Sequence, residues 1–203
     1  ALFNLMCEMP DVELIGGKNY VTPFTNYGVK VMSIGFFIDP NEAVIWRGPR
    51  ASSGLTQLLK DTNWGELDYL IIDTPPGPGD VHITLLQNFS PTGVIVVTTP
   101  QEMALSDVKK AINMYSDKQI GIPIIGVVEN MSWFTPVNHP DEKYYIFGNG
   151  GGERLAKEFK VPLLTRIPMN EKMCKSCDTG KMDELFSDSA IKSAFAELTD
   201  SIL

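Results

Sequence analysis

The chain has 203 residues, 43% of them hydrophobic and 21% charged, which is typical of a globular domain with a sizeable core. Its 17 Lys and Arg face 25 Asp and Glu, and the net charge of −8 argues against nucleic-acid binding or stable membrane association through bulk charge. Three cysteines cannot form a disulfide framework, and no signal peptide or apolar run of about 18 residues is present. We therefore expect a cytoplasmic protein.

Short apolar runs alternate with segments of helical periodicity along the chain. The first extended segments, YVTPF and VKVMSIGFF, flank the turn-like stretch TNYG and predict a hairpin or a pair of extended segments. Four later runs are almost continuously hydrophobic, as expected for strands buried on both faces of a parallel sheet: residues 67–73, 93–99, 123–130 and 161–167.

Helical spacing of apolar residues predicts four helices between and after these strands. Their apolar faces comprise Leu55, Leu58 and Leu59; Leu105, Val108, Ile112 and Tyr115; Leu155, Ala156 and Phe159; and Ile191, Phe195, Leu198 and Ile202. The second helix is predicted to begin with a capping box from Thr99 to Glu102. The alternation predicts one α/β domain over residues 1–203, with a mostly parallel sheet flanked by helices.

The strongest chemical signal follows the run at residues 67–73. This run ends at Asp73 and continues as TPPGPGD. In open α/β sheets ligands gather at the carboxyl ends of strands, where a carboxylate can hold Mg²⁺ through the water ligands of the ion. A glycine just beyond it, such as Gly77, exposes a backbone N–H to a terminal phosphate. From the spacing alone, an aspartate that only ends a strand before a proline-stiffened turn is an equal alternative.

The residue types in this motif are more specific than their spacing. DTPPGPGD resembles the DxPPGTGD switch motif of the Mrp/ApbC family, P-loop ATPases of the deviant Walker class implicated in carrying iron–sulfur clusters. Further segments resemble that family in its order: GVKVMSIGFFIDPNEAVIWRGP, WGELDYLIID, VVENMSWF, YYIFGNGGGERLA and VPLLTRIP. The resemblance implies a P-loop NTPase-like fold, ATP and Mg²⁺ as cofactors, a homodimer, and apoprotein clients that receive clusters.

The resemblance also implies roles for individual residues. Asp73 is the Walker B acid of the catalytic site, holding Mg²⁺ through water, and Gly77 is the switch glycine on the γ-phosphate. Asn130 hydrogen-bonds the adenine edge, and the backbone around Pro168 lines the other side of the base. Without the family context, Asn130 is equally a cap at the end of its strand, and Pro168 a strand terminator.

One part of a P-loop ATPase is missing from the 203 residues. No G-x-x-x-x-G-K-[ST] string is present, and Lys18 after Gly16 and Gly17 belongs to a surface turn before a strand. In the relatives, the strand and loop that carry this string precede the point where this chain begins. We therefore expect an ATPase fragment that does not hydrolyse ATP by itself, because it lacks the main phosphate donors.

The cysteines depart from the family pattern. Relatives place a cluster-binding C-x-x-C after the ENM segment, whereas residues 132–145 here contain no cysteine. A different pair, Cys174 and Cys177, shares a face if its segment is helical, and Lys175 between them favours thiolates. Two such pairs across a dimer axis would hold an iron–sulfur cluster or Zn²⁺; a chance pair of exposed thiols is the alternative. Cys7 is expected to be buried or partly buried.

Three other functions remain open from the residues alone. A MinD/ParA-like positioning ATPase is disfavoured, because the last predicted helix carries Lys192 as its one cation and the chain is acidic. A non-enzymatic interaction module without a P-loop is a second alternative. A redox protein that uses Cys174 and Cys177 is the third, although this C-x-x-C lies late in the chain.

Overall fold

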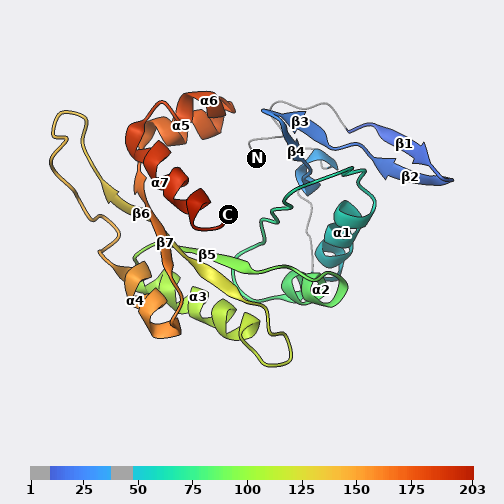
Figure 1. Cartoon of the computed structure of the whole chain (residues 1–203), viewed down its shortest axis with the longest axis horizontal. Helices are drawn as coiled ribbons and strands as arrows, with labels where there is room; N and C mark the ends of the chain where they lie inside the picture. Colours follow the sequence, from blue (N-terminus) through green and yellow to red (C-terminus); the bar gives the residue numbers. More distant parts are fainter. Residues whose placement is uncertain (1–9, 38–47) are drawn as a thin grey trace. The chain divides into compact units, whose positions relative to one another are not determined.

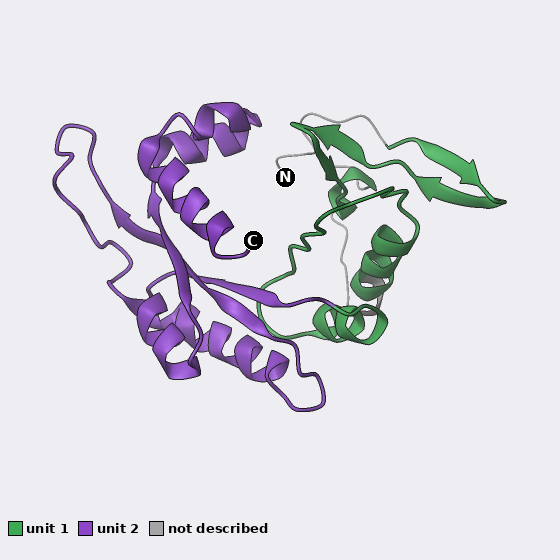
Figure 2. Ribbon diagram, viewed as in Figure 1, with its two compact units in different colours: residues 1–90 green, residues 91–203 purple. Residues whose placement is uncertain are grey.

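The computed structural model describes residues 10–37 and 48–203, which fall into two compact units, residues 1–90 and 91–203 (Figure 2). Among the described residues, the first unit contains two hairpins and two α-helices, and the second contains a three-stranded sheet with its helices. One domain spanning residues 1–203 stays a prediction. Cys7 lies outside the described residues.

The first unit opens with two antiparallel hairpins. Their strands are β1 (Val12–Ile15) with β2 (Lys18–Val21), and β3 (Phe24–Asn26) with β4 (Val29–Val31). Gly16 and Gly17 form the turn of the first hairpin, both with positive φ, as two-residue hairpin loops require. The predicted surface turn before Lys18 and the hairpin around residues 25–28 are confirmed, although strand β4 ends at Val31.

The predicted strand at residues 67–73 is wrong in this structure. The residues between helix α1 (Gly48–Lys60) and helix α2 (Asp80–Asn88) form no strand, although α1 itself confirms the helix predicted from its leucines. Ile71 is 91% exposed and Tyr69 65% exposed. A buried parallel strand needs hydrogen bonds from neighbouring strands and helices over both faces. Within residues 10–37 and 48–203, no strand pairs with this segment.

The second unit is a parallel α/β layer structure (Figure 1). Its sheet has the order β5-β6-β7, and all neighbouring strands are parallel. The strands are β5 (Val94–Thr98), β6 (Ile124–Phe134) and β7 (Leu163–Met169); the helices are α3 (Glu102–Tyr115), α4 (Gly151–Phe159), α5 (Glu171–Thr179), α6 (Met182–Leu185) and α7 (Ser189–Asp200). The predicted strands at 93–99, 123–130 and 161–167 are confirmed.

Helices cover both faces of this sheet, which explains the continuous hydrophobic runs of its strands. Helices α3 and α4 lie on one face and α7 on the other (Figure 1). The first face buries Val96, Leu105, Ile112, Val127, Leu155 and Ala156. The second face buries Val128, Leu164, Ile167, Leu185, Ile191 and Ala194. Val127 and Val128 are adjacent in β6 and point to opposite faces, as expected for a strand buried on both sides.

Two predicted helix boundaries are wrong. Helix α3 begins at Glu102 after the N-cap Gln101, and no side chain caps it. The carboxylate of Glu102 pairs with Arg154 of helix α4 instead of bonding to the backbone of a capping box. Helix α7 ends at Asp200, so Ile202, predicted to belong to its apolar face, lies beyond the helix and is 37% exposed.

The N-termini of helices α5 and α7 are joined through their capping side chains. Asn170 caps α5, and its Oδ1 accepts the N–H groups of Lys172 and Met173. Asn170 also donates through Nδ2 to Oδ2 of Asp188 at 2.9 Å. The other carboxylate oxygen of Asp188 caps α7 by accepting backbone N–H groups there. The hydrogen-bonded pair of Asn170 and Asp188 therefore supplies acceptors for backbone N–H groups at the starts of both helices.

We predict that Asp188→Ala lowers the free energy of unfolding by about 1–2 kcal/mol at pH 7, because it removes a helix cap. Burial raises the pKa of Asp188, but hydrogen bonds from Asn170 and from the backbone of Ile191 and Ala190 outweigh it and hold the pKa below its ordinary value. A depressed pKa in the folded state stabilises the protein above the unfolded pKa and is lost as the pH falls through the folded value. Urea denaturation at neutral and acidic pH measures the difference between wild type and variant. That difference should shrink in acid; an unchanged difference contradicts the charge argument.

Among the helices of the described residues, none is both long enough and apolar enough to span a lipid bilayer.

Candidate functional site

The predicted switch segment lies in the first unit, ahead of helix α2. Asp73 is exposed, and no hydrogen bond or ion pair of its carboxylate is found within residues 10–37 and 48–203. Gly77 has φ +75°, and no heavy atom lies within 4 Å of where a Cβ would be. An available carboxylate is the type of oxygen ligand that Mg²⁺ and its waters accept, and an open glycine leaves its backbone accessible. These residues therefore fit the predicted magnesium and phosphate contacts chemically.

Asn130 and Pro168 lie in the second unit, near the carboxyl ends of neighbouring strands. Asn130 pairs with Ile167 across β6 and β7, so the structure brings Asn130 close to Pro168 in the sheet. Asn130 was expected at the end of its strand, but β6 continues to Phe134 through an irregularity at which Met131 has φ +53°. Pro168 was expected after the last strand, but it lies within β7.

The register of the sheet explains both differences. Asn130 pairs with Ile167 and Phe134 with Met169, so four residues of β6 advance against two of β7. Pro168 lies opposite this bulge, where the hydrogen-bond ladder does not need the N–H that proline lacks. The side-chain oxygen of Asn130 accepts the N–H of Met131 at 2.9 Å. Its Nδ2 has no partner within the described part of the chain and remains available as a donor.

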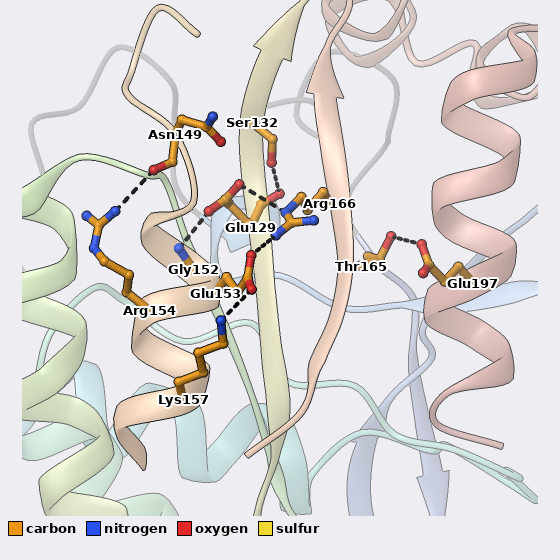
Figure 3. Close-up of polar contacts among 10 residues, drawn as sticks. All are labelled: Glu129, Ser132, Asn149, Gly152, Glu153, Arg154, Lys157, Thr165, Arg166 and Glu197. Atoms are coloured by element: carbon orange, nitrogen blue, oxygen red, sulfur yellow. Dashed lines mark hydrogen bonds and ion pairs between the residues drawn. The ribbon is translucent and has the colours of Figure 1, made fainter. Parts of the chain in front are cut away.

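A buried carboxylate lies next to Asn130 in β6 and holds the start of helix α4 (Figure 3). Glu129 is 1% exposed, and its Oε2 accepts the N–H of Gly152 at 2.6 Å. The α4 N-terminus carries a partial positive charge and unpaired N–H groups, so it is a natural place for an anion. In the structure, the group that occupies this place at the start of α4 is the carboxylate of the chain's own Glu129.

Arg166 of β7 connects this buried acid with a second carboxylate (Figure 3). Its Nε lies 3.6 Å from Oε1 of Glu129, and its Nη2 lies 2.6 Å from Oε2 of Glu153. Glu153 also pairs with Lys157 one helical turn later, at 2.7 Å. The hydrogen bond and charge of Lys157, followed by the charge of Arg166, hold the pKa of Glu153 below its ordinary value. The network thus ties helix α4 to strands β6 and β7.

Next to this network lies a cavity of about 380 Å³ within the second unit. Its wall combines two acids, two cations and two aromatic rings: Glu129, Glu197, Lys143, Arg166, Trp133 and Tyr145. Most of these groups are already engaged, since Glu197 accepts from Thr165 at 2.8 Å and the Lys143 ammonium lies 4.2 Å from the centre of the Trp133 ring. The side chains that line the cavity therefore belong to the polar network that positions β6 and β7.

Cys174 and Cys177 lie on helix α5, which confirms that the two thiols share a helix (residues Glu171–Thr179). Cys174 is exposed and Cys177 half-buried. The expectation that Lys175 favours a thiolate is wrong for Cys174. The charge of Asp178, followed by burial and the hydrogen bond to Asp178 Oδ2 at 3.7 Å, raises the pKa of the Cys174 thiol. The acid on the next turn therefore outweighs the adjacent lysine.

In the part of the chain that the structure describes, no third ligand accompanies these cysteines. Within residues 10–37 and 48–203 no group of three or more His, Cys, Asp or Glu side chains suits a metal ion. His139 pairs with Glu142 at 3.2 Å with both side chains exposed. A four-thiolate centre at α5 would thus require cysteines from a second chain.

Glu129 and Arg166 organise the polar part of the second unit, and neither was predicted from the sequence. The available signal was the glycine cluster that opens a helix, since Gly152 must lack a side chain: a Cβ there would lie 2.8 Å from the Cβ of Glu129. That close contact identifies Glu129 as the partner, but it joins residues 23 positions apart and has no local sequence signature.

Comparison with curated proteins gives a consistent set of relatives. An iron–sulfur cluster carrier protein of Synechocystis is 46% identical over 78% of this chain and 44% of its own length. An iron–sulfur cluster carrier protein of Aquifex aeolicus is 42% identical, over 88% of this chain and 49% of the relative. The iron–sulfur cluster transfer protein NUBPL of Dictyostelium discoideum is 42% identical, over 88% and 60%. The chain thus spans about half the length of these curated relatives.

Solved structures give the same fold. A nucleotide-binding protein from Archaeoglobus fulgidus, in complex with ADP, superposes with a TM-score of 0.69 and 34% identity, over 88% of this chain and 67% of that protein. MinD from Pyrococcus horikoshii, complexed with Mg-ADP, matches with a TM-score of 0.50 and 20% identity, over 77% and 56%. The predicted P-loop NTPase-like α/β fold is confirmed.

The family model that matches the chain is ParA, described as NUBPL iron-transfer P-loop NTPase, and the match covers residues 3–203. This match agrees with the resemblance that DTPPGPGD and the following segments indicated. The chain therefore belongs to the ParA family of NUBPL-type iron-transfer P-loop NTPases.

Proposed function

We propose that the chain acts as part of a nucleotide-dependent iron–sulfur cluster carrier that delivers clusters to apoproteins in the cytoplasm. The observation that carries this proposal is the family match over residues 3–203, together with relatives named iron–sulfur cluster carrier proteins at 42–46% identity. The cluster is the cargo, and ATP with Mg²⁺ is the cofactor. The acidic net charge and the absence of a basic last helix support this function over a MinD-like membrane function.

The nucleotide contacts proposed for this chain divide between the phosphate and the base. Asp73 holds the waters of Mg²⁺, and the Gly77 backbone N–H donates to the terminal phosphate. Bound Mg²⁺ supplies charge neutralisation for the phosphates. Asn130 donates through Nδ2 to the adenine edge, and the backbone around Pro168 borders the base. What supports these roles is the available carboxylate of Asp73, the open surroundings of Gly77 and the neighbouring positions of Asn130 and Pro168.

The cargo ligands proposed for this chain are Cys174 and Cys177, with the matching pair of a second copy completing a four-thiolate set. A homodimer is thus part of the proposal. Its support is that both thiols are free and lie on one helix, while no further ligand accompanies them in the described residues. Zn²⁺ competes for the same four-thiolate geometry.

Anaerobic reconstitution of the chain with ferrous iron and sulfide tests the cargo function. We expect visible charge-transfer absorption, retained in Cys7→Ser and lost in Cys174→Ser and in Cys177→Ser. Incubation with an apo-ferredoxin should then restore the ferredoxin spectrum. A chain that stays colourless contradicts the carrier function, whereas cluster binding that survives in both α5 variants contradicts only the ligand assignment. Iron and zinc analysis of the purified chain separates the two metals.

We also predict that the 203-residue chain does not turn over ATP above the protein-free rate. The G-x-x-x-x-G-K-[ST] loop is absent from these residues, so the backbone and lysine donors that stabilise the transferring phosphoryl group are missing. Phosphate release with Mg-ATP measures this, and Asp73→Asn is the matched control. Release well above the protein-free rate that disappears in Asp73→Asn would contradict the prediction.

A further inference from the structure

The two cysteines of helix α5 lie three residues apart on the same helix. Residues at this spacing are neighbours on one helix face, with Cβ atoms about 5–6 Å apart. A disulfide needs Cβ atoms about 3.5–4.5 Å apart, so bond formation requires them to approach by about 1–2 Å. The short helix can absorb this approach, because it extends only from Glu171 to Thr179 and ends at Gly180 in the left-handed region.

Access to the two sulfur atoms differs in a way that suits a two-step exchange. Cys174 is exposed and meets a solution reagent first, whereas Cys177 is half-buried on the same helix. The turn that carries both thiols is anchored at its start by Asn170, whose side chain accepts the N–H groups of Lys172 and Met173. Both cysteines are free thiols in the structure.

We propose that Cys174 and Cys177 form a reversible thiol–disulfide site that exchanges with small-molecule disulfides of the glutathione class. This reaction goes beyond cluster carriage and does not depend on it, since it needs only the two sulfur atoms of one chain. The approach required of the Cβ atoms makes the resulting disulfide strained and exposed, and such disulfides are readily reduced again.

The exchange balances in two steps. The Cys174 thiolate attacks one sulfur of glutathione disulfide, forming a mixed disulfide and releasing one glutathione thiolate. The Cys177 thiolate then attacks the Cys174 sulfur, forming the Cys174–Cys177 disulfide and releasing the second glutathione thiolate. The two protons lost by the cysteines end on the two glutathione molecules. Two thiols are oxidised to one disulfide, and one glutathione disulfide is reduced to two thiols.

Peptide mapping of the chain in the Cys7→Ser background tests the site. After equilibration with glutathione disulfide and alkylation of remaining thiols, trypsin cleaves after Lys172, Lys175 and Lys181. The disulfide should hold peptides 173–175 and 176–181 together until reductant is added, and the pair should be two hydrogen atoms lighter than its reduced peptides. In Cys174→Ser and in Cys177→Ser, the remaining thiol should carry glutathione instead. Peptides that separate without reductant overturn the proposal, as does a disulfide that joins two chains.

Discussion

Replacing Glu129 by alanine is expected to lower the free energy of unfolding by about 2–4 kcal/mol, because a buried N–H group and a guanidinium lose the carboxylate that they contact. The substitution leaves the buried N–H of Gly152 without its 2.6 Å acceptor and removes the carboxylate that faces Arg166. It also leaves a cavity, because Glu129 is buried and only 1% exposed. Urea denaturation followed by tryptophan fluorescence measures the effect.

Two related variants make this result specific. Glu129→Gln keeps an acceptor for Gly152 but removes the charge, so its cost should be smaller than that of Glu129→Ala. Glu153→Ala removes the second carboxylate that pairs with Arg166. Because Lys157, the other partner of Glu153, is exposed, the loss of unfolding free energy should stay within about 1 kcal/mol. If Glu129→Ala costs no more than Glu153→Ala, the buried carboxylate does not hold helix α4 in place.

The sequence predicted the second unit well because its strands carry their own signature. The runs at 93–99, 123–130 and 161–167 are covered by helices on both faces, so nearly every position is apolar. The run at 67–73 has the same pattern but is not a strand here. A hydrophobic run specifies burial, whereas a strand also needs a hydrogen-bonding neighbour, and the pattern of one segment does not say which neighbour it has.

A sequence motif predicts which residues form the candidate site. It does not predict where the pairing register of the strands places them. DTPPGPGD predicts Asp73 and Gly77 as site residues, and the strand runs predict that Asn130 and Pro168 lie at strand ends. The continuation of β6 past Asn130 depends on a bulge, which is a property of the pairing with β7 and not of either strand alone. Cys174 shows the same limit, because the acid one turn away governs its pKa more than the adjacent lysine does.

Substituting Gly151 by alanine is expected to cost about 2–3 kcal/mol of unfolding free energy, through overpacking against fixed backbone. A Cβ at this position would lie 2.4 Å from the carbonyl oxygen of Pro100 and 2.7 Å from its Cα. These atoms belong to the main chain between β5 and α3 and cannot rotate away as a side chain could. The better helix propensity of alanine offsets less than about 1 kcal/mol of this cost at the first turn of α4.

Gly150→Ala is the matched control for this steric argument, because it changes the adjacent glycine of the same cluster. Gly150 has φ +68° with no heavy atom within 4 Å of a Cβ, so alanine there costs only backbone strain of about 1–2 kcal/mol. Thermal or urea unfolding of both variants ranks the two effects. Because Pro100 lies so close, we expect Gly151→Ala to lower the free energy of unfolding more than Gly150→Ala does. The opposite ranking would mean that the loop before α3 yields, and that the left-handed conformation at Gly150 is the stricter requirement for starting helix α4.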